Sequence, residues 1–254
     1  MLYWVVKRLV AEPVLTPLLR PWVRGAEHVP ASGPAVLASN HLSYADPVLL
    51  PTVLRRRVTF IAKAEMFTGS GVRGRLFGGF LRGIGQLPVD RSGGRASSGA
   101  IDAALGVLAR GELLGIYPEG TRSPDGRLYR GRTGVARIAL RSGAPVLPVA
   151  VVGTGELMPR GRLLPRVRRV GVVIGEPMDF SRYAGRADDQ FVLRSVTDEV
   201  MAAVQRLSHQ EYVDAYALRH GAPPAGGPGG TGGSGGSGGP GGRGAPGGGG
   251  AARP

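Results

Sequence analysis

Short apolar runs alternate with helical patterns through most of the chain. The runs are bounded by glycine, proline or charged residues, which is typical of buried strands; they are residues 36–38, 59–61, 113–117, 146–152 and 170–174. Apolar residues at helical spacing lie between them, in 47–54, 71–81, 100–108, 135–140 and 190–207. This alternation predicts an α/β layered domain whose mostly parallel or mixed central sheet is flanked by helices.

The first 22 residues have a different pattern, in which aromatic and aliphatic residues lie beside basic ones. Tyr3, Trp4 and Leu9 are apolar, and Lys7 and Arg8 stand among them. A membrane-spanning helix needs about 20 mostly apolar residues, and here charged residues and prolines interrupt the run. Residues 1–22 are therefore predicted to form an amphipathic, membrane-associating helical segment; the alternative is a helix packed on the core of its own domain.

The last 37 residues are almost entirely glycine, proline, alanine and serine. Such a segment has almost nothing to bury, so residues 218–254 are predicted to be a disordered tail. Residues 232–236 match the Gly-x-Ser-x-Gly nucleophile elbow by chance, because that motif needs a strand before it and a helix after it. Residues 23–217 remain as the folded domain.

Charge and cysteine content narrow the possible partners. The chain has 32 basic and 18 acidic residues, a formal net charge of +14, and no cysteine. The positive charge favours an anionic partner: nucleic acid, an anionic lipid surface or a phosphorylated small molecule. The absence of cysteine excludes disulfides, thiolate metal sites and a cysteine nucleophile.

One segment combines a histidine and an aspartate between an apparent strand and a helix. His41 and Asp46 are five positions apart, about 140° on an ideal helix, so they can pair only if a turn folds His41 back. Asp46 also has structural interpretations: it caps the helix with Pro47 at the first position, or Ser43 is the cap and Asp46 lies in the first turn.

Three further segments place charged residues at strand ends. They are Gly85-Gln86-Leu87-Pro88-Val89-Asp90-Arg91, Tyr117-Pro118-Glu119-Gly120-Thr121-Arg122-Ser123 and Ala144-Pro145-Val146-Leu147-Pro148-Val149. Arg91, Glu119 and Arg122 would lie where open α/β sheets bind their ligands, although each also fits an ordinary surface or turn position.

Together these segments resemble the glycerolipid acyltransferases, specifically the 1-acyl-sn-glycerol-3-phosphate acyltransferases. The likeness consists of Asn-His-x-Ser-x-x-Asp, Asp-Arg, Pro-Glu-Gly-Thr-Arg-Ser and a proline-containing apolar segment, in that order, across about residues 20–180. Tyr117 stands where phenylalanine is common and Val89 where isoleucine is, and neither exchange alters the chemistry that the resemblance implies.

The resemblance implies a role for seven residues. His41 would be the general base and Asp46 its orienting partner, whereas the acceptor site would include Lys63, Arg91, Glu119, Gly120 and Arg122. The implied reaction passes a fatty acyl group from acyl-coenzyme A or acyl carrier protein to the sn-2 hydroxyl of lysophosphatidate, with no metal or other cofactor. The expected location is the cytoplasmic face of the cell membrane, held peripherally or monotopically by anionic lipids.

Two alternatives belong to other substrate or protein classes. The acceptor could be glycerol 3-phosphate or another lysolipid, because the motifs do not distinguish them. A basic nucleic-acid-binding protein would also fit the charge, but the chain has no zinc-ligand spacing, helix-turn-helix pattern or stacking aromatics. We therefore expect no nucleic-acid partner.

Overall fold

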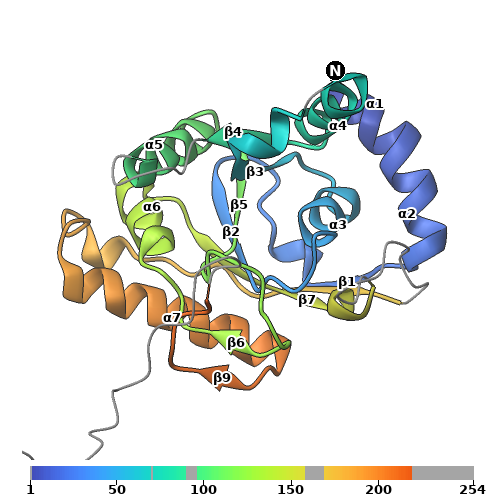
Figure 1. Ribbon diagram of the computed structural model, residues 1–254. Helices are drawn as coiled ribbons and strands as arrows, with labels where there is room; N and C mark the ends of the chain where they lie inside the picture. Colours follow the sequence, from blue (N-terminus) through green and yellow to red (C-terminus); the bar gives the residue numbers. More distant parts are fainter. Residues whose placement is uncertain (1, 70, 90–95, 158–168, 219–254) are drawn as a thin grey trace, which may run out of the picture. The chain divides into compact units, whose positions relative to one another are not determined.

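A seven-stranded sheet forms the centre of the protein (Figure 1). The computed structural model describes residues 2–69, 71–89, 96–157 and 169–218. The strands of this sheet are β1 (Trp22–Arg24), β2 (Ala35–Ser39), β3 (Val58–Lys63), β4 (Gln86–Val89), β5 (Leu113–Ile116), β7 (Val146–Val152) and β8 (Gly171–Ile174). Their order is β1-β8-β7-β2-β5-β3-β4, and neighbours are parallel except β7 and β8. The predicted α/β fold with a mostly parallel or mixed sheet is confirmed.

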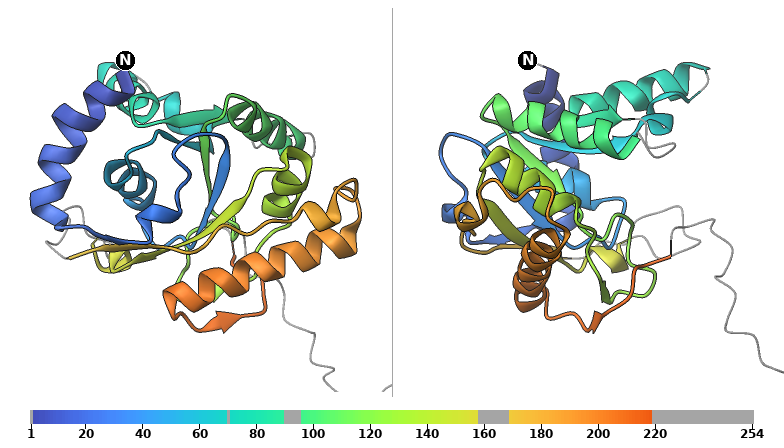
Figure 2. Two further views of the ribbon diagram at one scale, coloured as in Figure 1. Left: turned by 180° about the vertical axis from the view of Figure 1, so that it is seen from behind. Right: turned by 90° about the vertical axis from the view of Figure 1, so that its left-hand side faces the viewer.

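Helices cover both faces of the sheet. They are α1 (Leu2–Val6), a π-helical stretch (Lys7–Ala11), α2 (Glu12–Leu19), α3 (Asp46–Val53), α4 (Gly71–Gly83), α5 (Ala96–Ala109), α6 (Gly134–Ser142) and α7 (Gln190–Ser208). Figures 1 and 2 show α5, α6 and α7 on one side of the sheet and α2 and α3 on the other. Strand β2 is buried along its whole length, as expected of a strand covered on both faces.

The side chains of β2 alternate between two hydrophobic cores. Val36 and Ala38 pack with apolar residues of α5, α6 and α7. Ala35 and Leu37 pack with α3 and with Leu19 at the end of α2. This alternation follows from the period of two along a strand, and it fixes β2 at the centre of the molecule.

The register of β2 and β5 determines where the loops after them emerge. The two strands are parallel, and Ala38 is paired with Ile116. The loop that begins at Asn40 and the turn that begins at Tyr117 therefore leave the sheet at the same edge. His41, in the loop, and Tyr117, at the start of the turn, are 76 positions apart in sequence. The pairing of the two strands brings them together.

Several strands were not predicted from the sequence. Strands β1, β6 (Leu128–Tyr129) and β9 (Tyr212–Val213) have only two or three residues, too few for a period-two pattern to be visible. Residues 85–91 were expected to be a helix end followed by an apolar and then charged stretch, and were not among the runs assigned to strands, yet Gln86–Val89 form β4 at the edge of the sheet. A proline such as Pro88 is tolerated in an edge strand, where a missing N–H costs little.

The start of α3 also differs from both sequence interpretations. The helix begins at Asp46, its cap position is Ala45, and no side chain caps it. Asp46 does lie in the first turn, but Ser43 is not the cap. The carboxylate of Asp46 instead points back to the preceding loop, as described below.

The N-terminal residues are helical, as predicted. Leu2–Leu19 form one helical segment with the π-helical stretch in its middle. None of the helices in the described ranges has the length and apolar character needed to cross a bilayer. The predicted disordered tail falls almost entirely on residues 219–254, which lie outside the described residues.

Candidate active site

The loop between β2 and α3 brings His41 and Asp46 into contact. The Nδ1 atom of His41 lies 2.8 Å from Oδ2 of Asp46. The Asp46 side chain is fully buried, whereas the His41 side chain is 15% exposed. The imidazole is thus held by a carboxylate on one nitrogen, and Nε2 has no hydrogen-bond partner among the described residues. This arrangement suits a general base that meets a substrate from the open side.

Asp46 is held by the backbone of the same loop. Its Oδ2 accepts hydrogen bonds from the N–H groups of Leu42, at 2.7 Å, and Ser43, at 2.8 Å. These two bonds require a tight turn just before α3, and this turn places His41 beside Asp46. Oδ2 thus accepts from three donors: the two N–H groups and the imidazole of His41. These hydrogen bonds hold the carboxylate in contact with the imidazole.

Asn40 anchors the start of this loop to the neighbouring strand. Its buried amide donates to the carbonyl of Val151 at 3.1 Å and accepts from the N–H of Val151 at 2.7 Å. It also donates to Oε1 of Gln210 at 2.7 Å. Asn40 therefore continues the hydrogen-bonding of β7 past the end of β2, which fixes the position from which His41 projects.

The turn after β5 lies directly against the imidazole. The ring of Tyr117 stacks on that of His41, with centroids 3.9 Å apart and planes inclined by 13°. Phe60 stacks on Tyr117 in turn, at 5.3 Å. Sequence reasoning treated Tyr117 as a neutral exchange for phenylalanine and gave it no role, because stacking between residues 76 positions apart has no local signal.

Glu119 is buried behind the same turn. Its side chain accepts from the N–H of His41 at 3.3 Å and from the N–H of Tyr129 at 2.9 Å. The residue is 1% exposed, and burial raises the pKa of its carboxyl to about 7 despite these two bonds. In this structure Glu119 ties three segments together: the β2–α3 loop, the turn after β5 and strand β6.

Gly120 and Arg122 complete the turn. Gly120 has a φ of +74°, and its N–H donates to the carbonyl of Tyr117 at 2.9 Å. A side chain at this position would be strained by that φ and would press on Arg132, 3.1 Å from the added carbon. The guanidinium of Arg122 lies 3.6 Å from the centre of the Tyr44 ring, so it stands over the β2–α3 loop.

The two remaining residues implied by the sequence are less defined. Lys63 is the last residue of β3 and is in register with Val89 of β4, two positions before Arg91 in sequence. Arg91 lies outside the described residues. The structure thus gathers His41, Asp46, Glu119, Gly120 and Arg122 at one edge of the sheet.

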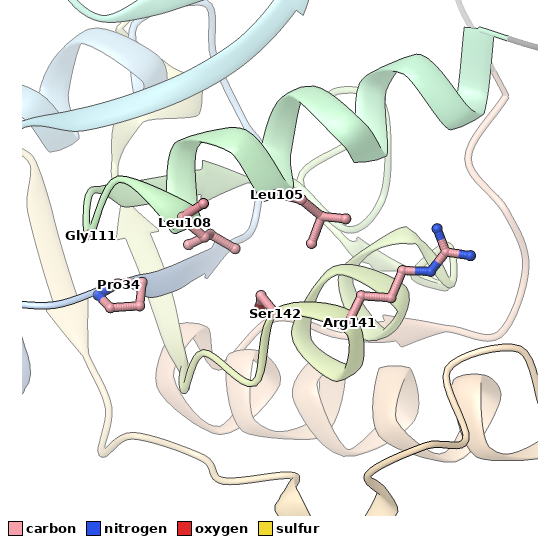
Figure 3. Close-up of a pocket in the computed structure, with 7 residues that line it drawn as sticks. Pro34, Leu105, Leu108, Gly111, Arg141 and Ser142 are labelled. Carbon is pink, nitrogen blue, oxygen red and sulfur yellow. The ribbon is translucent and has the colours of Figure 1, made fainter.

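A separate cavity lies at the opposite edge. It has a volume of about 480 Å³ and is lined by residues of α5 and α6 and by Pro34 and Gly111, which precede β2 and β5 (Figure 3). His41 follows the other end of β2, so this cavity is not part of the candidate active site. In the described ranges, no group of histidines and carboxylates could hold a metal ion.

Comparison with known proteins agrees with this site. The model of the acyltransferase family matches residues 20–152, a range that holds the His41–Asp46 pair and the turn from Tyr117 to Arg122. The chain therefore belongs to the acyltransferase family.

The relatives that it resembles have a more specific name. A 1-acyl-sn-glycerol-3-phosphate acyltransferase of Bacillus subtilis is 32% identical over 64% of this chain and 75% of that protein. A chloroplastic one of Brassica napus is 31% identical over 61% of this chain. The crystal structure of the 1-acyl-sn-glycerophosphate acyltransferase of Thermotoga maritima superimposes with a TM-score of 0.62 at 28% identity, covering 81% of this chain and 79% of that one.

The match does not extend over the whole of every relative. The alignment spans 44% of the Brassica napus protein and 42% of a chloroplastic relative from Arabidopsis thaliana. The chain thus spans less than half the length of these plant proteins.

Proposed function

We propose that this protein transfers a fatty acyl group from a thioester to the sn-2 hydroxyl of 1-acyl-sn-glycerol 3-phosphate, giving phosphatidate. The observation that carries the proposal is the 2.8 Å contact between His41 Nδ1 and Asp46 Oδ2, at the sheet edge where the turn from Tyr117 to Arg122 also emerges. The names of the relatives support the choice of acceptor.

The pair supplies the chemistry that the acceptor hydroxyl needs. Nε2 of His41 takes the hydroxyl proton while the hydroxyl oxygen attacks the thioester carbonyl carbon, and general-base help of this kind is worth about 10²–10⁴-fold. Asp46 holds Nδ1–H and stabilises the imidazolium that forms. When the tetrahedral intermediate collapses, the carbon–sulfur bond breaks and the imidazolium returns its proton to the leaving thiolate. The acyl group passes directly to the acceptor, without an acyl-enzyme.

Arg122, at the same edge, provides binding for the acceptor phosphate, and Arg91 and Lys63 are proposed to contribute. Arg122 stacks over Tyr44, and no hydrogen bond or carboxylate contact engages its guanidinium among the described residues, which leaves its N–H groups for an anion. Arg91 follows the end of β4 in sequence, and Lys63 ends the adjacent β3. Charge-assisted hydrogen bonds from these groups would orient the hydroxyl at His41.

The N-terminal helical segment provides a means of reaching a lipid acceptor. Trp4, Val5 and Leu9 are 41%, 49% and 72% exposed, and Arg8 stands beside them in sequence. Apolar insertion together with attraction to anionic headgroups is the combination that holds proteins at a bilayer surface. We therefore propose a peripheral or monotopic position on the cytoplasmic face of the membrane.

A thioester-release assay tests the proposal. Purified protein is mixed with acyl-coenzyme A, or with acyl carrier protein carrying the same chain, and free thiol is measured with and without lysophosphatidate. We expect thiol release and phosphatidate formation that depend on lysophosphatidate with at least one donor, and the two donors are compared directly. Release that is equal without any acceptor, or transfer to glycerol 3-phosphate in preference to lysophosphatidate, would reject this acceptor.

A further inference from the structure

The candidate active site contains two buried oxygen atoms that lack a hydrogen-bond partner. They are Oδ1 of Asp46 and the hydroxyl oxygen of Tyr117, and neither has a partner among the described residues. A buried polar atom without a partner is costly and calls for an explanation. The two atoms have complementary chemistry, because a phenol donates a hydrogen bond and a carboxylate oxygen accepts one.

The two groups also influence each other electrostatically. Burial raises the pKa of the Tyr117 hydroxyl well above its ordinary value, and the negative charge of Asp46 raises it further. The hydroxyl therefore keeps its proton at any pH at which the protein works, so it remains a donor. Asp46 has all three of its hydrogen bonds on Oδ2, which leaves Oδ1 as the free acceptor on this side of the pair.

The position of the Tyr117 ring gives it a second contact with the pair. It lies parallel to the His41 imidazole with centroids 3.9 Å apart, closer than its 5.3 Å stack on Phe60. The ring stacked on the imidazole restricts rotation of the imidazole about its χ angles. Its π-face also lies where positive charge develops when His41 takes up a proton.

We propose that Tyr117 is a positioning residue for the His41–Asp46 pair. Its ring sets the plane of the imidazole, and its hydroxyl, which makes no direct hydrogen bond to Asp46, is linked to Oδ1 of Asp46 through one bridging water molecule. The link holds the carboxylate so that Oδ2 stays directed at Nδ1. This role rests on the proposed acyl transfer, in which His41 is the general base.

The hydroxyl and the ring have separable effects on His41. A hydrogen-bond donor on Oδ1 withdraws electron density from the Asp46 carboxylate. Asp46 therefore stabilises the imidazolium of His41 less strongly. Loss of the hydroxyl alone should therefore make His41 hold its proton to a higher pH. Loss of the ring should leave the imidazole free to turn away from the acceptor. Among the described residues, Glu119 is the other titratable group that contacts His41, since it accepts from its backbone N–H, and it is retained in both variants.

Two substitutions and one matched control separate these effects. Tyr117→Phe removes the hydroxyl and keeps the stack, whereas Tyr117→Leu removes both. Phe60→Leu is the control, because it takes an aromatic ring from the same stack without touching His41. The rate of acyl transfer is measured against pH, and the imidazole signals are followed by NMR through a pH titration. The chain has four histidines, so the His41 signal is assigned by its loss in His41→Gln.

The expected results are specific to each variant. In Tyr117→Phe the acid limb of the rate profile and the His41 titration midpoint should both move up by about half a pH unit, a threefold change in proton affinity. In Tyr117→Leu the maximal rate should fall about tenfold with the KM for lysophosphatidate unchanged. Phe60→Leu should lower thermal stability but leave the profile and the midpoint in place.

The outcomes that overturn the proposal are equally distinct. A Tyr117→Phe variant that keeps the parent's His41 midpoint would remove the hydroxyl link. A Tyr117→Leu variant with the parent's maximal rate would remove the positioning role of the ring. The NMR titration does not depend on catalysis. If the parent protein shows no acyl transfer, the proposed function fails, while the link between Tyr117 and Asp46 is still decided by the NMR result.

Discussion

The two nitrogens of His41 have different surroundings, and this difference defines the chemistry of the site. Nδ1 is held by a fully buried carboxylate, which fixes the tautomer that has the acceptor lone pair on Nε2. The backbone N–H of His41 is fixed separately by Glu119, and its carbonyl accepts from Ser123 at 2.8 Å. A single residue is thus held at its ring, its amide and its carbonyl, which leaves little freedom except at the reactive nitrogen.

Glu119 should give the protein a measurable dependence of stability on pH. Its pKa is raised to about 7 in the folded state by burial, so between about pH 4.5 and 7 the folded protein holds a proton that the unfolded chain has lost. Folding is therefore favoured at the acidic end of this window, and stability falls as pH rises through it. From pH 5 to pH 8 this single group should lower the free energy of unfolding by about 2 kcal/mol.

Urea unfolding at several pH values checks this prediction. Glu119→Gln cannot titrate, so its free energy of unfolding should fall less than that of the parent between pH 5 and pH 8. Equal slopes in the two proteins would show that Glu119 is ionised throughout this range.

Arg122 should affect acceptor binding more than the chemical step. Arg122→Ala removes a cation proposed to hold the acceptor phosphate, and charge-assisted hydrogen bonds of this kind are worth about 1.5–3 kcal/mol. The KM for lysophosphatidate should therefore rise roughly 10–100-fold, with a smaller change in kcat. Arg206→Ala, on the exposed side of α7, is the control. The phosphate role would be lost if the dependence of rate on lysophosphatidate were the same in all three proteins.

At the scale of elements, long periodic segments and strands of four or more apolar residues were predictable, whereas strands of two or three residues were not. The helical pattern of residues 190–207 and the apolar run of residues 146–152 correspond to α7 and β7 within one residue at each end. Strands β6 and β9 have two residues each, and their pairing depends on contacts between segments far apart in sequence. The predicted cap of α3 was also wrong. The Asp46 carboxylate does not cap the helix, because it accepts hydrogen bonds from the loop before the helix and from His41.

The N-terminus of α7 offers a test of local helix stability. Asp189 caps this helix by accepting from the N–H groups of Phe191, at 2.9 Å, and Val192, at 3.3 Å. Asp189→Ala leaves both donors without this acceptor, and the free energy of unfolding should fall by about 1 kcal/mol. Because α7 lies far from the reacting groups along the chain, the KM for lysophosphatidate should not change.

Asp188→Ala is the matched control for this prediction. Asp188 is adjacent and acidic, but its side chain is 82% exposed and contacts only Arg141, at 3.2 Å, among the described residues. Exposed pairs of this kind contribute little. Denaturant unfolding that showed the same loss for both aspartates would contradict a specific capping role for Asp189.

At the scale of the whole molecule, the site depends on which strands are neighbours. The motifs around His41 and Glu119 were recognisable in sequence, but their contact follows from the pairing of β2 with β5. The roles of Asn40 and Tyr117 were missed for the same reason, since both act on segments distant in sequence. The seven assigned roles came from resemblance to a family, and the structure supplies the geometry of those that it describes.

The N-terminal segment should contribute to membrane binding through its exposed apolar side chains. Leu9 is 72% exposed, so Leu9→Glu should leave the fold intact while placing a negative charge where insertion is proposed. Its affinity for anionic vesicles should fall by roughly 10-fold or more, since burial of one large apolar side chain is worth about 1.5–3 kcal/mol. Vesicle sedimentation at fixed ionic strength measures this change.

Phe191→Glu is the matched control for the vesicle experiment. Phe191 is 88% exposed on α7, so this variant carries the same change in charge at a site outside the N-terminal segment. Its sedimentation should equal that of the parent. Equal losses in both variants would point to net charge, and not to insertion of Leu9, as the cause.

The central claim is that His41, oriented by Asp46, removes the proton of the acceptor hydroxyl. The most direct measurement compares phosphatidate formation by the parent, by His41→Ala and by the control variant His209→Asn. His209 is the C-terminal cap residue of α7 and has a left-handed backbone conformation. We predict that His41→Ala stays folded but loses about 10²–10⁴-fold in rate, and that His209→Asn retains the parent rate. A folded His41→Ala protein that forms phosphatidate as fast as the parent would contradict this account.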